Sequence, residues 1–240
     1  MACKALKSRV KGMFPMGKRI IVFAPHPDDG VLGCGGTIAK RISQGYDVLM
    51  VVLTDGRYAF SNVLGINSNP TPEDMKTIRI EEVKNGVKVL GMSEKQLLFL
   101  NFEDSSLESN EREVKQKVLK ILEENHPVEV YFPCDKEYHK DHLVTNRVLE
   151  GACKELNLNA VKYKYSITQR YARLGPLMDS FLNLFKRNMV SCDISSYLSL
   201  KEEAVNKFRS KFLLLSKQKK SSTESFRKFL KEKETFFIDK

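Results

Sequence analysis

The sequence predicts an α/β protein with a mostly parallel sheet covered by helices on both faces. Short apolar runs alternate with longer segments that have apolar residues at helical spacing. Each apolar run is almost free of polar residues, as expected for strands that are buried on both faces of a parallel sheet. The chain has 240 residues, of which 42% are hydrophobic and 29% charged. This composition supports a folded core and excludes a mainly disordered protein.

Each predicted element rests on a local apolar pattern and on the residue that ends it. Arg19–Pro25 (RIIVFAP) is a β-branched apolar run that stops at a proline, which is typical of a buried strand. Gly30–Gln44 has apolar residues at helical spacing and is followed by Gly45. The next elements follow in the same way: a strand at Asp47–Thr54, a long loop at Gly56–Pro72, a helix at Pro72–Leu90 and a strand at Gln96–Asn101.

The second half continues the alternation and is then expected to become helical. The predicted elements are a helix at Asn110–Asn125, a strand at Pro127–Pro133, a helix at Lys140–Leu156 and a strand at Ala160–Tyr165. Residues 175–190 and 197–235 look helical, so the C-terminal part from about 175 to 240 is predicted as helical. We expect a basic N-terminal tail at 1–18 and a single domain at 19–240.

Charge and cysteine content exclude several classes of protein. The formal net charge is +10, but the basic excess lies in residues 1–20 and 201–240. Solvated tails and helix faces usually carry such charge, so we expect no nucleic-acid binding. No apolar run is long enough for a transmembrane helix, and the N-terminus lacks the apolar core of a secretory signal. The five cysteines are widely spaced, which favours a reducing, cytoplasmic setting.

Chemically active residues gather in loops that follow predicted strands. Parallel sheets bind ligands beyond the carboxyl ends of their strands. After the first strand comes Pro25-His26-Pro27-Asp28-Asp29, and after the fourth comes Tyr138-His139-Lys140-Asp141-His142. Three of the four histidines lie in these two segments, each beside a carboxylate. His126 stands apart, at a predicted helix end, and is interpreted as structural.

Imidazole and carboxylate side chains are the ligands of catalytic zinc sites. Two histidines and one aspartate leave a coordination position open for water, whose pKa the metal lowers to about 7. Of the adjacent Asp28 and Asp29, one suits a metal ligand and the other a general base. Of His139 and His142, one suits the metal and the other the substrate. The residues alone leave these assignments open.

The two motifs resemble those of the PIG-L/LmbE-like N-acetylglucosaminyl deacetylases. His26-Pro27-Asp28-Asp29 and His139-x-Asp141-His142 carry the resemblance, which extends from about residue 18 to the end of the chain. It implies a Rossmann-like three-layer α/β fold with a mostly parallel sheet and a helical C-terminal extension. It also implies a zinc-dependent hydrolase that removes the N-acetyl group from GlcNAc-containing molecules.

The resemblance also implies a role for each site residue. His26, Asp29 and His142 are expected to bind Zn²⁺, although Fe²⁺ or another divalent transition metal suits the same ligands. Asp28 is expected to be the general base. His139 is expected to stabilise the oxyanion, with Asp141 hydrogen-bonded to it to keep it charged. Two further residues, Arg79 and Asp104, are expected to contact sugar hydroxyl groups; a surface ion pair of Arg79 with Glu81 or Glu82 is the alternative.

One residue departs from the family pattern. The family usually has a glutamate after the two aspartates, where this chain has Gly30. We expect altered surroundings of the site and an intact site. Two alternatives stay open: an amidohydrolase for another N-acyl substrate, and an impaired family member that acts as a binding protein. A homo-oligomer is expected. The apolar stretch Leu177–Phe185 is expected to pack on the core, with an oligomer interface second and lipid contact third.

Overall fold

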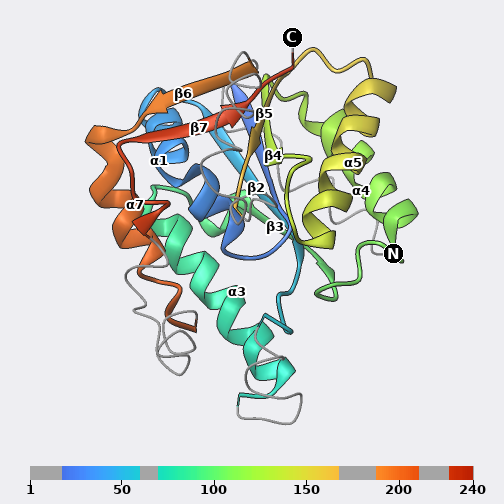
Figure 1. Ribbon diagram of the computed structural model, residues 1–240, viewed down its shortest axis with the longest axis horizontal. Helices are drawn as coiled ribbons and strands as arrows, with labels where there is room; N and C mark the ends of the chain where they lie inside the picture. The colour runs from blue at the N-terminus through green and yellow to red at the C-terminus, as the bar shows by residue number, and fades with distance from the viewer. Residues whose placement is uncertain (1–17, 60–69, 168–187, 211–226, 240) are drawn as a thin grey trace, which may run out of the picture.

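The computed structural model describes residues 18–59, 70–167, 188–210 and 227–239. In these residues seven strands form one sheet in the order β3-β2-β1-β4-β5-β7-β6 (Figure 1). The strands are β1 (Arg19–Ala24), β2 (Asp47–Thr54), β3 (Leu97–Phe102), β4 (Glu129–Pro133), β5 (Val161–Tyr165), β6 (Met189–Asp193) and β7 (Lys233–Phe237). The α-helices are α1 (Asp29–Ser43), α3 (Pro72–Val89), α4 (Glu111–Asn125), α5 (Lys140–Glu155) and α7 (Leu198–Val205).

The first five strands are parallel, as the sequence predicts. The central strand β1 pairs with β2 on one side and with β4 on the other. From β1 the chain builds outward through β2 to β3, and then returns to the other side of β1 for β4 and β5. The strand order therefore reverses between the neighbouring strands β1 and β4. In open α/β sheets, ligands bind at this point, beyond the carboxyl ends of the strands.

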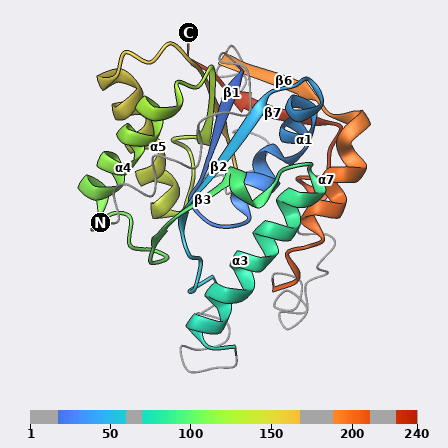
Figure 2. The same cartoon turned by 180° about the vertical axis from the view of Figure 1, so that it is seen from behind.

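Helices cover both faces of the sheet and complete a three-layer arrangement. Helices α4 and α5 lie on one face, and α1, α3 and α7 lie on the other (Figures 1 and 2). Two buried apolar clusters fill the two interfaces. Ile20 and Val22 of β1 belong to the cluster under α1, whereas Ile21 and Phe23 belong to the cluster under α4 and α5. This alternation is the period of two that a strand imposes.

The C-terminal part differs from the predicted helical extension. Of the helix predicted at 197–235, the described residues form α7 (Leu198–Val205), while Lys233–Phe237 is the strand β7. Strand β6 also occupies residues that were predicted to be helical. Both strands join the main sheet, β6 to β7 and β7 to β5, in antiparallel pairing. Their partners are distant in the sequence, so no local apolar pattern marks them.

Several predicted features lie wholly or largely outside the described residues. They are the basic tail at 1–18, the middle of the loop at Gly56–Pro72, the helix at 175–190 and the apolar stretch Leu177–Phe185. In the part of the chain that the structure describes, no helix is both long enough and apolar enough to cross a membrane.

The C-terminal strand is attached to helix α1 by a buried carboxylate. Glu234 of β7 accepts hydrogen bonds from the backbone N–H groups of Gly36 and Thr37 at 2.9 and 2.7 Å. It also pairs with the buried ammonium group of Lys201 on α7, at 2.6 Å. Because α1 begins at the site described below, this contact ties strand β7 to the helix that carries site residues.

Gly36 is packed closely enough to predict the effect of an added methyl group. A Cβ atom at this position lies 2.8 Å from Cβ of Ile194, well inside contact distance. We expect Gly36→Ala to lower the free energy of unfolding by about 1–3 kcal/mol through overpacking. Gly151→Ala on α5 is the matched control, because among the described residues no atom lies within 4 Å of its Cβ, apart from its chain neighbours and the backbone of its own helix. Helix propensity favours that control by up to about 1 kcal/mol. Equal effects in urea denaturation would contradict the packing argument.

Candidate metal centre

Three side chains converge at the switch point between β1 and β4. His26 lies in the turn after β1, Asp29 is the first residue of α1, and His142 lies in the first turn of α5. Nδ1 of His26 is 2.9 Å from Oδ2 of Asp29 and 3.2 Å from Nε2 of His142. Nε2 of His142 is 3.0 Å from the same Asp29 oxygen. Two nitrogens and one oxygen thus form a nearly equilateral triangle.

This triangle fits one divalent metal ion. Ligand atoms about 2.1 Å from one ion, at angles near 90–110°, lie about 3.0–3.4 Å apart. The three donor separations, 2.9, 3.0 and 3.2 Å, lie within this range or 0.1 Å below it, and all three residues are buried. Imidazole nitrogen and carboxylate oxygen are a donor set that zinc and iron both accept. The residues predicted as metal ligands therefore meet the geometric requirement.

The charges around the triangle also fit a cation. Among the described residues, the buried carboxylates in the site outnumber the one buried guanidinium group, that of Arg79; they are Asp28, Asp29, Asp104, Glu137 and Asp141. Burial alone would lower the pKa of His26, but the charge of Asp29 and hydrogen bonds to the nearby carboxylates raise it well above its usual value. The pKa of His142 is raised in the same way, mainly by Asp29. The surroundings thus favour positive charge at the positions of the two imidazole rings.

Asp28 lies beside the triangle and is held by Arg79. Nη2 of Arg79 donates to Oδ1 of Asp28 at 2.5 Å, and both side chains are almost completely buried. Arg79 also donates to the carbonyl oxygen of Gly56 at 3.3 Å. The alternative of a surface ion pair is wrong, because Arg79 is buried and Glu82 accepts instead from Ser210. The sugar contact expected of Arg79 stays a prediction.

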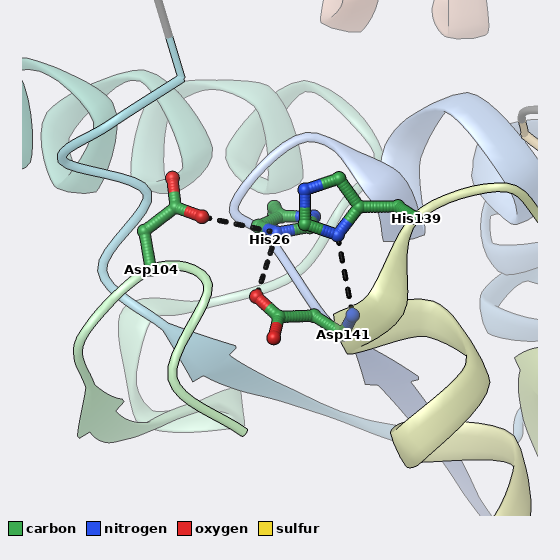
Figure 3. Close-up of side chains that lie close together, drawn as sticks. All are labelled: His26, Asp104, His139 and Asp141. Atoms are coloured by element: carbon green, nitrogen blue, oxygen red, sulfur yellow. Dashed lines mark hydrogen bonds and ion pairs between the residues drawn. The ribbon is translucent and has the colours of Figure 1, made fainter. Parts of the chain in front are cut away.

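Asp104 and Asp141 face the other nitrogen of His26. Figure 3 shows both carboxylates directed at Nε2 of His26, at 3.4 Å from Asp104 and 3.3 Å from Asp141. Burial alone would raise the pKa of Asp104, but its hydrogen bond with His26 and the charges of His26 and Arg79 lower it to about 2. Asp104 is therefore an anion in contact with a candidate metal ligand.

The expected contact between Asp141 and His139 is different in the structure. The carboxylate of Asp141 accepts from the backbone N–H groups of Ser105 and Leu107, at 2.8 and 3.2 Å. Only its backbone N–H meets His139, donating to Nδ1 at 3.2 Å (Figure 3). At the start of α5 the backbone directs the Asp141 side chain toward His26, so the expectation that this carboxylate keeps His139 charged is wrong.

His139 lies against the two candidate histidine ligands. Its ring packs edge-on against His26, with centroids 4.6 Å apart. Burial and the neighbouring His26 and His142 lower its pKa. Since Nδ1 accepts a hydrogen bond from the Asp141 N–H, a neutral ring carries its proton on Nε2.

Two features of the site were not evident from the sequence. Glu137, fully buried, lies 3.3 Å from Nδ1 of His142 through Oε2. Ser105 has a positive φ of 67°, an uncommon conformation for this residue, and this conformation accompanies the N–H group that it donates to Asp141. An acidic residue five positions before His142 was the one available sequence signal for Glu137.

Gly30 packs against the end of the Met50 side chain. A Cβ atom at this position lies 2.7 Å from the terminal methyl carbon of Met50, on the neighbouring strand β2. The end of the Met50 side chain thus lies where a side chain at position 30 would begin, and it would have to move to admit one. The departure from the family pattern is accompanied by a filled core and leaves the neighbouring Asp28 and Asp29 inside the site.

Comparison with known proteins decides the family. The model of the family described as "PIG-L: GlcNAc-PI de-N-acetylase" matches residues 21–153, which is more than half of the chain and includes both motifs. This chain belongs to the PIG-L family. The membership expected from His26-Pro27-Asp28-Asp29 and His139-x-Asp141-His142 is confirmed.

Individual PIG-L relatives agree with this assignment. The chain is 31% identical over 128 residues to a diacetylchitobiose deacetylase of Thermococcus kodakarensis, covering 52% of this chain and 45% of that protein. It is 29% identical over 144 residues to a probable N-acetyl-alpha-D-glucosaminyl L-malate deacetylase 2 of Bacillus cereus, covering 59% of this chain and 63% of that protein. The matched stretch thus spans less than two thirds of each of these two relatives.

A solved structure supports the fold of this PIG-L chain. The N,N'-diacetylchitobiose deacetylase from Pyrococcus horikoshii superposes with a TM-score of 0.68 at 22% identity, covering 98% of this chain and 89% of that one. At this identity the likeness concerns the fold, a Rossmann-like α/β arrangement with a mostly parallel sheet.

Proposed function

We propose that the protein is a metal-dependent N-deacetylase that hydrolyses the N-acetyl amide of a GlcNAc-containing sugar or glycoconjugate. The observation that carries this proposal is the donor triangle of His26, Asp29 and His142 beside the buried Asp28–Arg79 pair. A metal ion activates water, and an adjacent carboxylate can take a proton from that water; together these two groups can hydrolyse an amide.

His26, Asp29 and His142 would hold the ion, through Nδ1, Oδ2 and Nε2. When bound, a divalent ion such as Zn²⁺ or Fe²⁺ polarises the amide carbonyl and lowers the pKa of water. Three protein ligands are the number found in catalytic zinc sites, which keep a further position for water or substrate.

Asp28 is the general base in this proposal. Its carboxylate takes a proton from the attacking water and later returns it to the leaving amine nitrogen. Arg79 donates to Oδ1 of Asp28, so it fixes the orientation of the carboxylate and favours its ionised form. The products are acetate and a free amino sugar.

His139 is the donor to the carbonyl oxygen. With its Nδ1 occupied by the Asp141 N–H, the neutral ring presents an Nε2–H group. This group donates to the oxygen as it gains negative charge, in the manner of an oxyanion hole. A lowered pKa suits this role, because the neutral ring keeps the same donor over a wide pH range.

The names of two relatives support a GlcNAc-type sugar as the substrate of this protein. The two curated relatives above have GlcNAc-type compounds in their names, diacetylchitobiose and N-acetyl-alpha-D-glucosaminyl L-malate. Asp104 and Arg79 are proposed to contact sugar hydroxyl groups. Hydrolysis of a different N-acyl group stays the alternative, since the proposed roles of the metal ligands and Asp28 involve the amide group and not the sugar.

The test measures acetate release by the purified, zinc-loaded protein. N-acetylglucosamine, N,N'-diacetylchitobiose and an N-acetylated amino acid are offered in parallel, with and without a chelator. We expect chelator-sensitive release from at least one sugar. Release from the amino acid alone would favour the alternative, and release from none would contradict the proposed activity.

The homo-oligomer and the cytoplasmic location stay predictions. Light scattering would measure the oligomeric state.

A further inference from the structure

Glu137 is a buried carboxylate that the mechanism above does not use. It lies in the segment between β4 and α5 and is completely inaccessible to solvent. Its Oε1 accepts a hydrogen bond of 2.6 Å from the backbone N–H of Ile167, which follows β5. The carbonyl oxygen of Ile167 in turn accepts from Nζ of Lys228 at 3.0 Å. Glu137 is thus anchored through its own oxygen Oε1.

The other oxygen of Glu137 faces a metal ligand. Oε2 is 3.3 Å from Nδ1 of His142, while Nε2 of the same ring lies in the donor triangle. Among the described residues, Nδ1 of His142 has no well-aligned hydrogen-bond partner. Coordination through Nε2 forces the proton of a neutral imidazole onto Nδ1. A buried N–H group needs an acceptor, and Glu137 places one within reach.

His26 has the same arrangement with the roles of its two ring nitrogens exchanged. Its Nδ1 lies in the donor triangle, and its Nε2 faces the carboxylates of Asp141 and Asp104. Each candidate histidine ligand therefore has a buried carboxylate on its non-ligating nitrogen. Such carboxylates fix the tautomer and the ring orientation, and they raise the basicity of the ligating nitrogen.

We infer that Glu137 is a positioning residue of the metal centre, which holds His142 as the Nδ1–H tautomer with Nε2 directed at the ion. The inference rests on the metal site of the proposed function and is independent of the substrate. It extends the centre beyond the two sequence motifs, to a loop glutamate that is anchored on the backbone just after β5.

Glu137→Gln is the informative variant. One amide oxygen can accept from the Ile167 N–H, which leaves the amide NH₂ group to face Nδ1 of His142. An NH₂ group donates and therefore favours the Nε2–H tautomer, in which Nε2 cannot bind metal. We expect the dissociation constant for Zn²⁺, measured by chelator competition, to rise about 10–100-fold. The visible absorption of the Co²⁺-loaded variant should also change, because the His142 ring turns.

Glu129→Gln is the matched control. Glu129 is also buried, but it lies at the start of β4 and pairs with Arg41 and Tyr131. The control can lose thermal stability, yet it should bind Zn²⁺ as the unchanged protein does. Equal affinities of Glu137→Gln and the unchanged protein would overturn the inference. If the unchanged protein binds no metal, the proposed function fails as well.

A measurement on the unchanged protein covers the case in which Glu137→Gln does not fold. Long-range ¹H–¹⁵N spectra of the zinc-loaded protein report the tautomer of each histidine ring. We expect His142 to carry its proton on Nδ1, with slow exchange with water because the proton is buried and bonded to Glu137. A proton on Nε2, or fast exchange at Nδ1, would contradict the inference.

Discussion

Replacing Asp28 by asparagine is expected to slow acetate release by about 10²–10⁴-fold, the usual contribution of a general base. The amide has almost the same shape as the carboxylate, but it cannot take a proton from water. Its oxygen still accepts from Arg79, which preserves part of the buried contact. Zinc content should stay the same, because Asp28 is not part of the donor triangle. Steady-state kinetics and elemental analysis of the same preparation check both expectations.

Asp135→Asn is the matched control for Asp28→Asn. Asp135 lies in the loop after β4 and is exposed, so the same chemical change occurs near the site without touching it. Its rate should equal that of the unchanged protein. If Asp28→Asn keeps a rate within threefold of the unchanged protein, Asp28 is not the base. Circular dichroism establishes that the variant is folded, since Arg79 loses its charged partner.

Removing the imidazole of His142 is expected to abolish metal binding and, with it, activity. His142→Asn leaves two of the three donors in the triangle, which is fewer than catalytic zinc sites use. The loss of zinc affinity should exceed the roughly 10–100-fold effect of a supporting contact such as that of Glu137. Chelation followed by zinc addition should restore the unchanged protein and leave the variant inactive.

His126→Asn is the matched control for His142→Asn. His126 ends α4 with a left-handed backbone, at φ 43°, and asparagine tolerates this conformation. Zinc content of this variant should be unchanged. A His142→Asn protein that still binds one zinc ion tightly would show that the triangle is not the metal site.

The parallel part of the fold could be predicted because its signals are local. Strands β1, β2 and β4 are continuous apolar runs, and each is followed along the chain by a helix. The antiparallel strands could not be predicted in the same way. Met189–Asp193 and Lys233–Phe237 mix polar and apolar residues, and they are held by each other across a long stretch of chain. Each of these strands has only five residues, so its sequence contains no apolar pattern long enough to predict a strand.

The candidate site was predictable to the extent that topology decides it. His26 and His142 follow adjacent parallel strands, so they meet at the same edge of the sheet. Which carboxylate serves which histidine was not predictable. Sequence proximity suggests that Asp141 serves His139, but the first turn of α5 directs its carboxylate to His26. The contact of Glu137 with His142 depends on the path of a loop, which the sequence pattern does not describe.

The position of β7 between β5 and β6 has a consequence for the order of assembly during synthesis. Residues 233–237 are translated after β6, yet in the described part of the chain β6 joins the sheet through them. The carboxylate that accepts a hydrogen bond from the Gly36 N–H and pairs with Lys201 arrives in the same segment, 198 residues after Gly36. Until then Lys201 has no buried anion from β7, and α1 lacks its attachment to that strand. Closing contacts over such a distance is slow. The nascent chain therefore passes through a stage in which the five parallel strands are available but the sheet is unfinished.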